Sequence, residues 1–216
     1  MTRYKITIEY DGKNYNGWQA QKGLNTIQGA LEESVQLFCG EKVSIYGAGR
    51  TDTGVHASGQ VAHLDLDIES IEDKKNKLGK LTMGINYYLS RNFNNEITII
   101  SSKKVNQEFH ARFSAKYRRY KYTILNKRTG SPLNRNNSWR VSLPLNLQSM
   151  IKASKLLIGK HDFSSFRSTE CQSNSPIKTI DDISITKNKD FIFIKVTAKS
   201  FLMNQVRIIT GTLVEV

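Results

Sequence analysis

The amino-acid sequence predicts an α+β protein made of two halves, each a β-sheet with helices on one face. Segments with the two-residue period of half-buried strands alternate along the chain with segments of helical period. The order of strand, helix and strands in the first half recurs in the second half, with helices added. The 216 residues are enough to give each half a buried core.

In the first half, residues 3–11 alternate apolar and polar side chains, as a half-buried strand does. A helix is predicted between Thr26 and Gly40, because apolar residues recur there at helical spacing and glycine is a common stop. The other strands of this half are expected at residues 42–49, 60–68 and 96–105, and its second helix at residues 78–89.

The second half shows the same kinds of pattern. Its strands are predicted at residues 118–126, 180–187 and 190–200, and its helices at 147–157 and 200–213. The change between the halves is expected near residues 104–108. This divides the chain into an N-terminal half, 1–106, and a C-terminal half, 107–216.

Charge is distributed unevenly between the halves. The net charge is +13, yet residues 1–108 carry 13 basic and 13 acidic side chains. From residue 109 to residue 161 there are 12 Lys or Arg and no acid. An acid-free stretch of this length indicates a surface that binds a polyanion, most plausibly a nucleic acid.

Other features narrow the class of protein. Cys39 and Cys171 lie far apart in the sequence, which favours free thiols over a disulfide or a metal site. The N-terminus has charges among its apolar residues, unlike a secretory signal, and no apolar run has the length of a membrane span. We therefore expect a cytoplasmic protein with no membrane contact.

Residues 47–63, GAGRTDTGVHASGQVAH, form a glycine-rich loop with a single acid, Asp52. The loop lacks the lysine of a Walker motif, and Asp52 takes the place of the third glycine of a dinucleotide fingerprint. One interpretation is a plain β-turn. The other is a catalytic carboxylate, kept ionised by Arg50 and followed by His56, whose ring can bond the loop or a phosphate. The glycines of this loop allow a backbone or a nucleotide to approach closely.

This loop, read as G-A-G-R-T-D-x-G-V-H-A-x-G-Q-V, resembles the signature of the bacterial tRNA pseudouridine synthase A family. Further motifs in the family's order are YDGKNYNGWQAQ, TIQGALE, FHARFSAKYRRYKY, HDFSSFR and SFLMNQVRIITGTLVEV. The resemblance implies the pseudouridine synthase fold, with a mixed, mostly antiparallel sheet core and helices on the outer faces. It also implies a homodimer that isomerises uridine at tRNA positions 38–40 without cofactor or metal.

Site residues follow from the same resemblance. Asp52 matches the essential aspartate, Tyr120 the tyrosine that stacks on the target base, and Arg207 the basic partner of the aspartate. Arg50 matches a loop arginine that holds or extrudes the target nucleotide. From their positions beside Tyr120, Arg118 and Arg119 are expected to hold phosphates. Thr53 stands where alanine is common, and the family continues with a glycine-containing segment after the position of Val216, so we expect the C-terminal half to be truncated.

Two other functions fit parts of the sequence. A noncatalytic RNA-binding module needs the basic and aromatic residues but not Asp52. A metal-dependent nuclease needs clustered carboxylates, and the second half has only six acids. Two roles remain open for His110 and Arg112, which either touch RNA or brace a loop, whereas His63 is expected to be structural.

Overall fold

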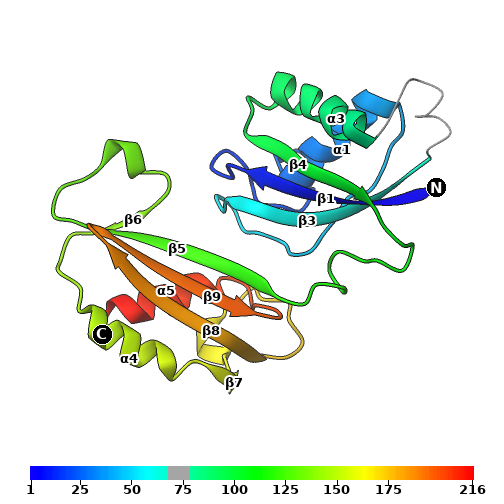
Figure 1. Cartoon of the computed structure of the whole chain (residues 1–216). Coiled ribbons are helices and arrows are strands. Elements are labelled where there is room, and N and C mark those ends of the chain that lie inside the picture. The colour runs from blue at the N-terminus through cyan, green and yellow to red at the C-terminus, as the bar shows by residue number, and fades with distance from the viewer. Residues whose placement is uncertain (68–77) are drawn as a thin grey trace. The chain divides into compact units, whose positions relative to one another are not determined.

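The computed structural model of the chain describes residues 1–67 and 78–216. By its contacts the chain divides into two compact units, Met1–Ala115 and Lys116–Val216. Among the described residues, each unit has one β-sheet with two α-helices on one face (Figure 1). All strand pairs of the described residues but one are antiparallel. The predicted α+β class with mixed, mostly antiparallel sheets is confirmed.

The first sheet has the strand order β2-β3-β1-β4. Strand β1 (Thr2–Tyr10) is central and pairs antiparallel with β3 (Ala57–Leu66) and β4 (Ile97–Lys104), while β2 (Tyr46–Gly47) pairs with the outer side of β3. Every second residue of β1 is buried, from Tyr4 to Tyr10. The predicted alternation thus gives the sheet one core face.

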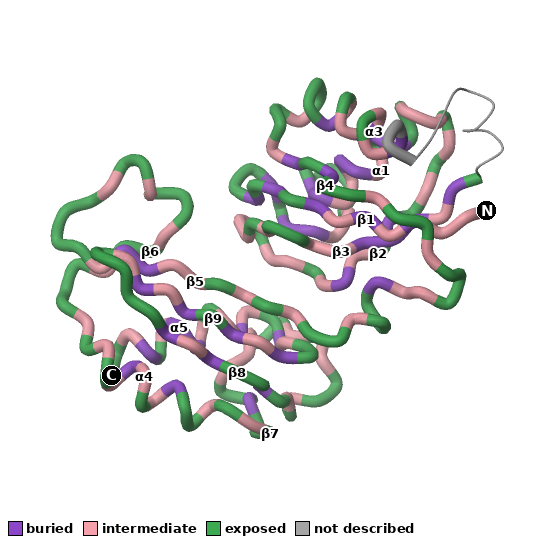
Figure 2. Tube along the Cα trace, in the orientation of Figure 1, coloured by how far each residue is buried: buried purple, intermediate pink, exposed green. Residues whose placement is uncertain are grey.

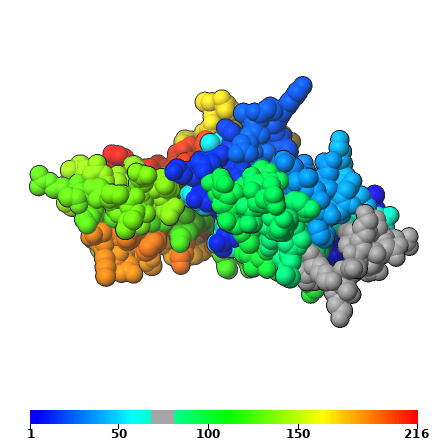
Figure 3. All heavy atoms as spheres, turned by 90° about the horizontal axis from the view of Figure 1, so that it is seen from above, coloured from blue at the N-terminus to red at the C-terminus, as the bar shows by residue number. Residues whose placement is uncertain are grey.

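Helices α1 (Ile27–Cys39) and α3 (Leu78–Asn92) cover that core face (Figures 1 and 2). The predicted ends of α1 are confirmed. The Thr26 side chain accepts a hydrogen bond from the Gly29 N–H, and Gly40 ends the helix in the left-handed conformation with φ 79°. Seen from the helix side in Figure 3, α3 (green) lies on the outside of the first unit.

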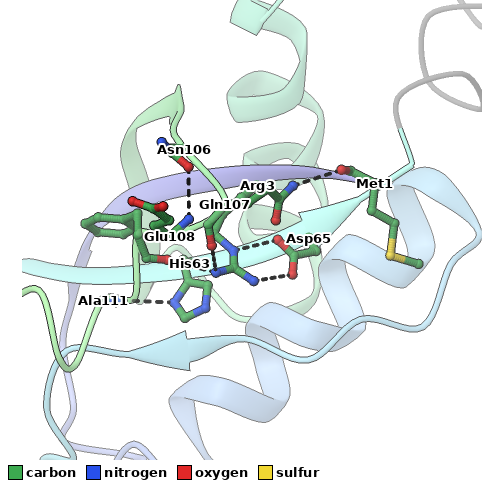
Figure 4. A network of polar contacts seen from close by, with 9 residues as sticks. Met1, Arg3, His63, Asp65, Asn106, Gln107, Glu108 and Ala111 are labelled. Atoms are coloured by element: carbon green, nitrogen blue, oxygen red, sulfur yellow. Dashed lines mark hydrogen bonds and ion pairs between the residues drawn. The ribbon is translucent and has the colours of Figure 1, made fainter.

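A segment of residues 105–114, here called the strap, packs on the other face of the first sheet. Arg3 holds it there (Figure 4). The Arg3 Nε and Nη2 atoms donate to the two carboxylate oxygens of Asp65 at 2.8 and 2.7 Å, and Nη1 donates to the carbonyl oxygens of Gln107 at 2.5 Å and Phe109 at 3.0 Å. The strap therefore belongs to the first unit, and the contact boundary lies later in the chain than the boundary predicted between 106 and 107.

The second sheet has the strand order β6-β5-β9-β8-β7, in which only the β5–β6 pair is parallel. The long strands agree with the sequence prediction, whereas the short strands at the two edges were not predicted. The strands are β5 (Arg118–Asn126), β6 (Trp139–Val141), β7 (Gly159–Asp162), β8 (Ile177–Asn188) and β9 (Phe191–Ala198).

Helices α4 (Leu147–Lys155) and α5 (Gln205–Val214) cover one face of the second sheet and bury its core, and single 3-10 turns lie at Pro132–Asn134 and Ser164–Phe166. The final helix begins later than the predicted residue 200. Asn204, the residue before α5, has φ 60°, a backbone conformation that does not continue a right-handed helix. Residues 200–204 thus form a non-helical entry to α5.

Candidate active site

Asp52 lies in a tight turn between β2 and β3. The backbone N–H of Val55 donates to the carbonyl oxygen of Asp52 at 3.2 Å, and Gly54 has φ 75°, which suits glycine at the third position of such a turn. Asp52 is half-buried. Within the described residues of the first unit, no hydrogen bond or ion pair occupies its carboxylate. The turn and a chemically available carboxylate therefore coexist at this position.

Residues 10–18, here called the clamp, hold the Asp52 loop in place. The Trp18 N–H donates to the carbonyl oxygen of Thr51 at 2.9 Å, and the Tyr10 hydroxyl lies 2.9 Å from the Thr51 hydroxyl. On the other side of Asp52, the Gly54 N–H donates to the carbonyl oxygen of Tyr15 at 3.4 Å. The residues on both sides of Asp52 are therefore bonded to the clamp.

Two glycines of the clamp allow it to approach this closely. A β-carbon on Gly12 would come to 2.0 Å from the Val55 carbonyl oxygen, and one on Gly17 to 2.5 Å from the Thr51 carbonyl oxygen. From the sequence, the close approaches were expected at the glycines of the loop itself. Of those, Gly47 packs against the Trp18 ring, whereas Gly54 has open space where a β-carbon would lie. In the sequence, the clamp glycines Gly12 and Gly17 stand in the tripeptides YDG and YNG, and these were the signal for the clamp.

Arg50 and His56 flank the aspartate without pairing with it. Within the first unit, the expected ion pair of Arg50 with Asp52 is not formed, and the exposed Arg50 lines a pocket instead. The Nδ1 atom of His56 lies 2.9 Å from a carboxylate oxygen of Asp11 and 3.2 Å from the Gly12 nitrogen. His56 thus joins the clamp to the end of the loop.

In the second unit, Tyr120 lies on the face of β5 that faces α4 and α5. Its cross-strand neighbour Val196 is fully buried. A strand face that carries Arg118, Tyr120 and Tyr122 is typical of a surface or groove, yet most of this face packs in the core of the second unit. Tyr120 itself is only half-buried, near the start of β5, and its ring meets Phe201 edge-on with centroids 5.1 Å apart. Part of this ring is accessible and its orientation is fixed.

The two arginines before Tyr120 differ in their surroundings. Arg118 is half-buried, and its guanidinium donates to the carbonyl oxygen of Lys199. Arg119 points to the opposite face, is exposed, and lies over the Tyr117 ring at 4.5 Å from the centroid. Arg119 is thus the arginine of this pair whose guanidinium is presented to solvent.

Arg207 is an exposed residue in the first turn of α5. A cation is electrostatically unfavourable there, because the N-terminal end of a helix carries partial positive charge. The neighbouring Gln205 is buried, and its side-chain nitrogen has no hydrogen-bond partner within the described part of the chain. Neither the charge of Arg207 nor the unpaired side-chain nitrogen of Gln205 stabilises the helix, so both residues are candidates for a functional role.

His63 is structural, as expected. It is buried on β3, and its Nδ1 atom accepts a hydrogen bond from the Ala111 N–H of the strap at 3.2 Å. Burial, followed by the positive charge of Arg3, lowers the pKa of the His63 imidazole. The neutral ring is therefore the form that holds the strap.

No cluster of three or more His, Cys, Asp or Glu side chains suited to a metal ion occurs among the described residues. Their helices are all too short or too polar to cross a membrane.

Comparisons with known proteins give the family. A family model described as tRNA pseudouridine synthase matches residues 6–114 and 153–216. Proteins named tRNA pseudouridine synthase A are 49% identical in Wolbachia pipientis wMel and in Ehrlichia ruminantium (strain Gardel), and 44% identical in Xanthobacter autotrophicus. These matches cover 99–100% of this chain and 83–84% of the relatives. Because similarity of this level extends over nearly the entire chain, the chain belongs to the tRNA pseudouridine synthase A family, a family of isomerases.

Proposed function

We propose that this chain converts uridine to pseudouridine at positions 38–40 of the tRNA anticodon stem-loop, with Asp52 as the catalytic group. The observation that carries the proposal is the clamped loop, which immobilises the residues on both sides of a half-buried carboxylate. A catalytic group held in a fixed position avoids reorganisation during the reaction. Attack on the ribose, attack on a uracil carbon and removal of a sugar proton each require this carboxylate in its ionised form.

The target uridine must leave the stack before it can react. Extrusion costs a few kcal/mol, and stacking on an aromatic ring recovers about 1–3 kcal/mol. We assign this stacking role to Tyr120, whose ring is half-buried and oriented by Phe201. Arg118 and Arg119 hold the adjoining phosphates in this proposal, with Arg119 the more exposed of the two.

Three further residues complete the proposed site. The family resemblance gives Arg207 as the cation that pairs with the catalytic aspartate, and its unfavourable place in the first turn of α5 supports a role outside helix stability. Arg50 and His56 flank Asp52 and are proposed to contact the RNA backbone. We also propose that the enzyme is a cytoplasmic homodimer, and sedimentation equilibrium of the purified chain tests the dimer.

The proposal is tested by release of tritium from tRNA labelled at uridine C5. The isomerisation breaks the bond between N1 and the ribose, and N1 takes up a proton from solvent. A bond forms between C5 and the ribose, and the C5 hydrogen is lost to solvent. We expect release by the parent chain in the presence of EDTA, and none by Asp52→Asn, with tRNA affinity retained. Asp181→Asn, which changes an exposed acid on β8, is the matched control and should remain active.

Each alternative function has its own outcome in this assay. If Asp52→Asn releases tritium at the parent rate, the catalytic assignment is wrong. If the parent binds tRNA without any release, the chain is a noncatalytic RNA-binding module. Cleavage of the tRNA that EDTA abolishes would instead indicate a metal-dependent nuclease.

A further inference from the structure

A pocket of about 230 Å³ lies beside the Asp52 loop in the first unit. Its lining combines two arginines, four aromatic rings and two glutamine amides, and Asp52 is not part of it. The residues used below are Gln19, Tyr46, Arg50, His110, Arg112 and Phe113. Sites that enclose drug-sized ligands measure about 300–1,000 Å³. This smaller volume suits a single flat group and not an entire cofactor.

The aromatic side of the pocket has exposed faces that are held in place. The Phe113 side chain is 76% exposed, and its ring lies 4.4 Å from the His110 ring at an angle of 35°. Tyr46 is 53% exposed and stacks on the buried His63 ring at 5.1 Å. His110 in turn meets His63 at 4.7 Å. These rings form a continuous cluster whose outer members, Phe113 and Tyr46, present aromatic surface to solvent.

The backbone that carries Phe113 is fixed as well. The Ser114 N–H donates to the His110 carbonyl oxygen at 2.8 Å, and the Ser114 hydroxyl accepts from the His110 N–H at 3.1 Å. Between them, the Ala111 N–H is bonded to His63. An aromatic ring on a fixed turn loses little conformational entropy when a ligand stacks on it.

A chain of hydrogen bonds sets the direction of the Gln19 amide. The Glu32 carboxylate, which only accepts, takes a hydrogen bond from Gln28 Nε2 at 2.8 Å and one from the Ile45 N–H at 2.9 Å. The Gln28 oxygen therefore faces the other way and accepts from the Ala20 N–H at 3.0 Å and from Gln19 Nε2 at 2.9 Å. Within the described residues, this leaves the Gln19 carbonyl oxygen as an acceptor for a ligand.

Charge completes the chemistry of the pocket. Arg50 and Arg112 are both exposed, and both residues line the pocket. Proteins hold unpaired nucleotides with aromatic faces for the base, guanidinium groups for the phosphates and amide acceptors for an N–H group.

We propose that this pocket binds one unpaired nucleotide of the tRNA other than the reacting uridine. Its base stacks on Phe113, its phosphates lie on Arg50 and Arg112, and an N–H of the base donates to Gln19 Oε1. The inference rests on the proposed function for its RNA substrate. Because Arg50 is two residues before Asp52, occupation of the pocket anchors the RNA next to the catalytic loop.

The test uses a tryptophan as a reporter in the pocket. Phe113→Trp is titrated with an unmodified tRNA transcript, and the emission of the parent chain, which contains Trp18 and Trp139, is subtracted. We expect quenching as a base stacks on the new indole. Tyr87→Trp is the matched control, since Tyr87 is an aromatic residue on α3 that is 56% exposed and outside the pocket. Its emission should not change.

Affinity gives a second measurement. Fluorescence anisotropy should show tRNA binding to Phe113→Ala weakened by about 5- to 150-fold, the equivalent of one lost stacking contact, with Tyr87→Ala unchanged. Arg112→Gln should lower the slope of log affinity against log salt concentration by about 1.

The outcomes separate this inference from the proposed function. If the parent releases tritium but Phe113→Trp is not quenched at saturating tRNA, the pocket inference is wrong and the proposed function stands. If quenching occurs without tritium release, the pocket binds RNA and the proposed function is wrong. If the parent does not bind tRNA at all, both are overturned.

Discussion

Gly12 lies directly against the carbonyl group of Val55, where a β-carbon would come within 2.0 Å of the oxygen. The same glycine has its backbone nitrogen 3.2 Å from Nδ1 of His56. The clamp and the Asp52 loop therefore fit together only while position 12 has no side chain. The position of the proposed catalytic carboxylate depends on a residue forty positions earlier in the chain.

We expect Gly12→Ala to displace the loop. A shift of about 1 Å in a catalytic group can cost about 100-fold in rate, so turnover should fall by at least that factor while tRNA affinity changes little. Tritium release and tRNA anisotropy measure the two effects. Gly130→Ala is the matched control, because a β-carbon there meets no atom within 4 Å. Equal turnover in the two variants would contradict the clamp's role.

The second prediction concerns Arg3. Arg3→Met removes a two-point pair with Asp65 and two bonds to strap carbonyls, so the free energy of unfolding should fall by about 1–3 kcal/mol. Urea denaturation measures this loss. Lys127→Met is the control, because its pair with Asp190 is 3.6 Å long and about half exposed, and such pairs contribute about 0–1 kcal/mol. An equal loss in both variants would show that the strap contacts add nothing.

The third prediction is a pH dependence that arises from His63. Burial lowers the pKa of its imidazole below the ordinary value of 6.5, so in acid the unfolded chain binds a proton that the folded chain resists. The contribution of the neutral ring is complete above that value and decreases as the pH falls below it. Protonation of Nδ1 also removes the acceptor for the Ala111 N–H. Urea midpoints at about pH 7.5 and about pH 5.5 measure the change.

A variant separates His63 from other titrating groups. In His63→Asn, which does not titrate, the loss of stability between these two pH values should be smaller than in the parent. His161→Asn changes an exposed histidine and should keep the parent's pH dependence. If His63→Asn keeps the full dependence, the effect has another source.

The fourth prediction concerns RNA binding by the basic second unit. Arg119 is exposed over the Tyr117 ring, within the stretch that contains no acids. Arg119→Gln should weaken tRNA binding and reduce its salt slope by about 1, as expected for one lost phosphate contact. Lys187→Gln, a change of an exposed lysine outside that stretch, should leave the slope unchanged. Anisotropy at several salt concentrations gives both slopes.

Local signals in the sequence were sufficient for much of the fold. Strand β1 follows from the alternation of its own residues. The ends of α1 follow from its capping residues, Thr26 and Gly40. Short edge strands depend on partners that are distant in the sequence. A strand was predicted at residues 42–49, yet β2 has only two residues, Tyr46–Gly47. The Ile45 N–H donates to the Glu32 side chain instead of to a strand. Strand β6 has only three residues and no readable period.

The proposed site could be inferred from the sequence where its chemistry is local. Asp52 stands out as the single acid of a glycine loop, and the family motifs pointed to it. The clamp contacts of Gly12 and Gly17 are tertiary, so they needed the structure. The pocket cluster likewise joins Phe113 of the strap to Tyr46 of β2, two residues that no sequence period connects. For His110 and Arg112 the sequence left two roles open, and both residues line that pocket.

The bonds between the clamp and the Asp52 loop have a consequence for the evolution of the enzyme. The clamp contributes mostly main-chain atoms, such as the Trp18 N–H and the Tyr15 carbonyl, which are present whatever side chain those positions carry. Exposed positions between its glycines, such as Lys13 and Asn16, are therefore free to diverge without moving the proposed catalytic turn. A lineage can therefore change the surface chemistry of these positions while the main-chain bonds that hold the Asp52 loop are inherited unchanged.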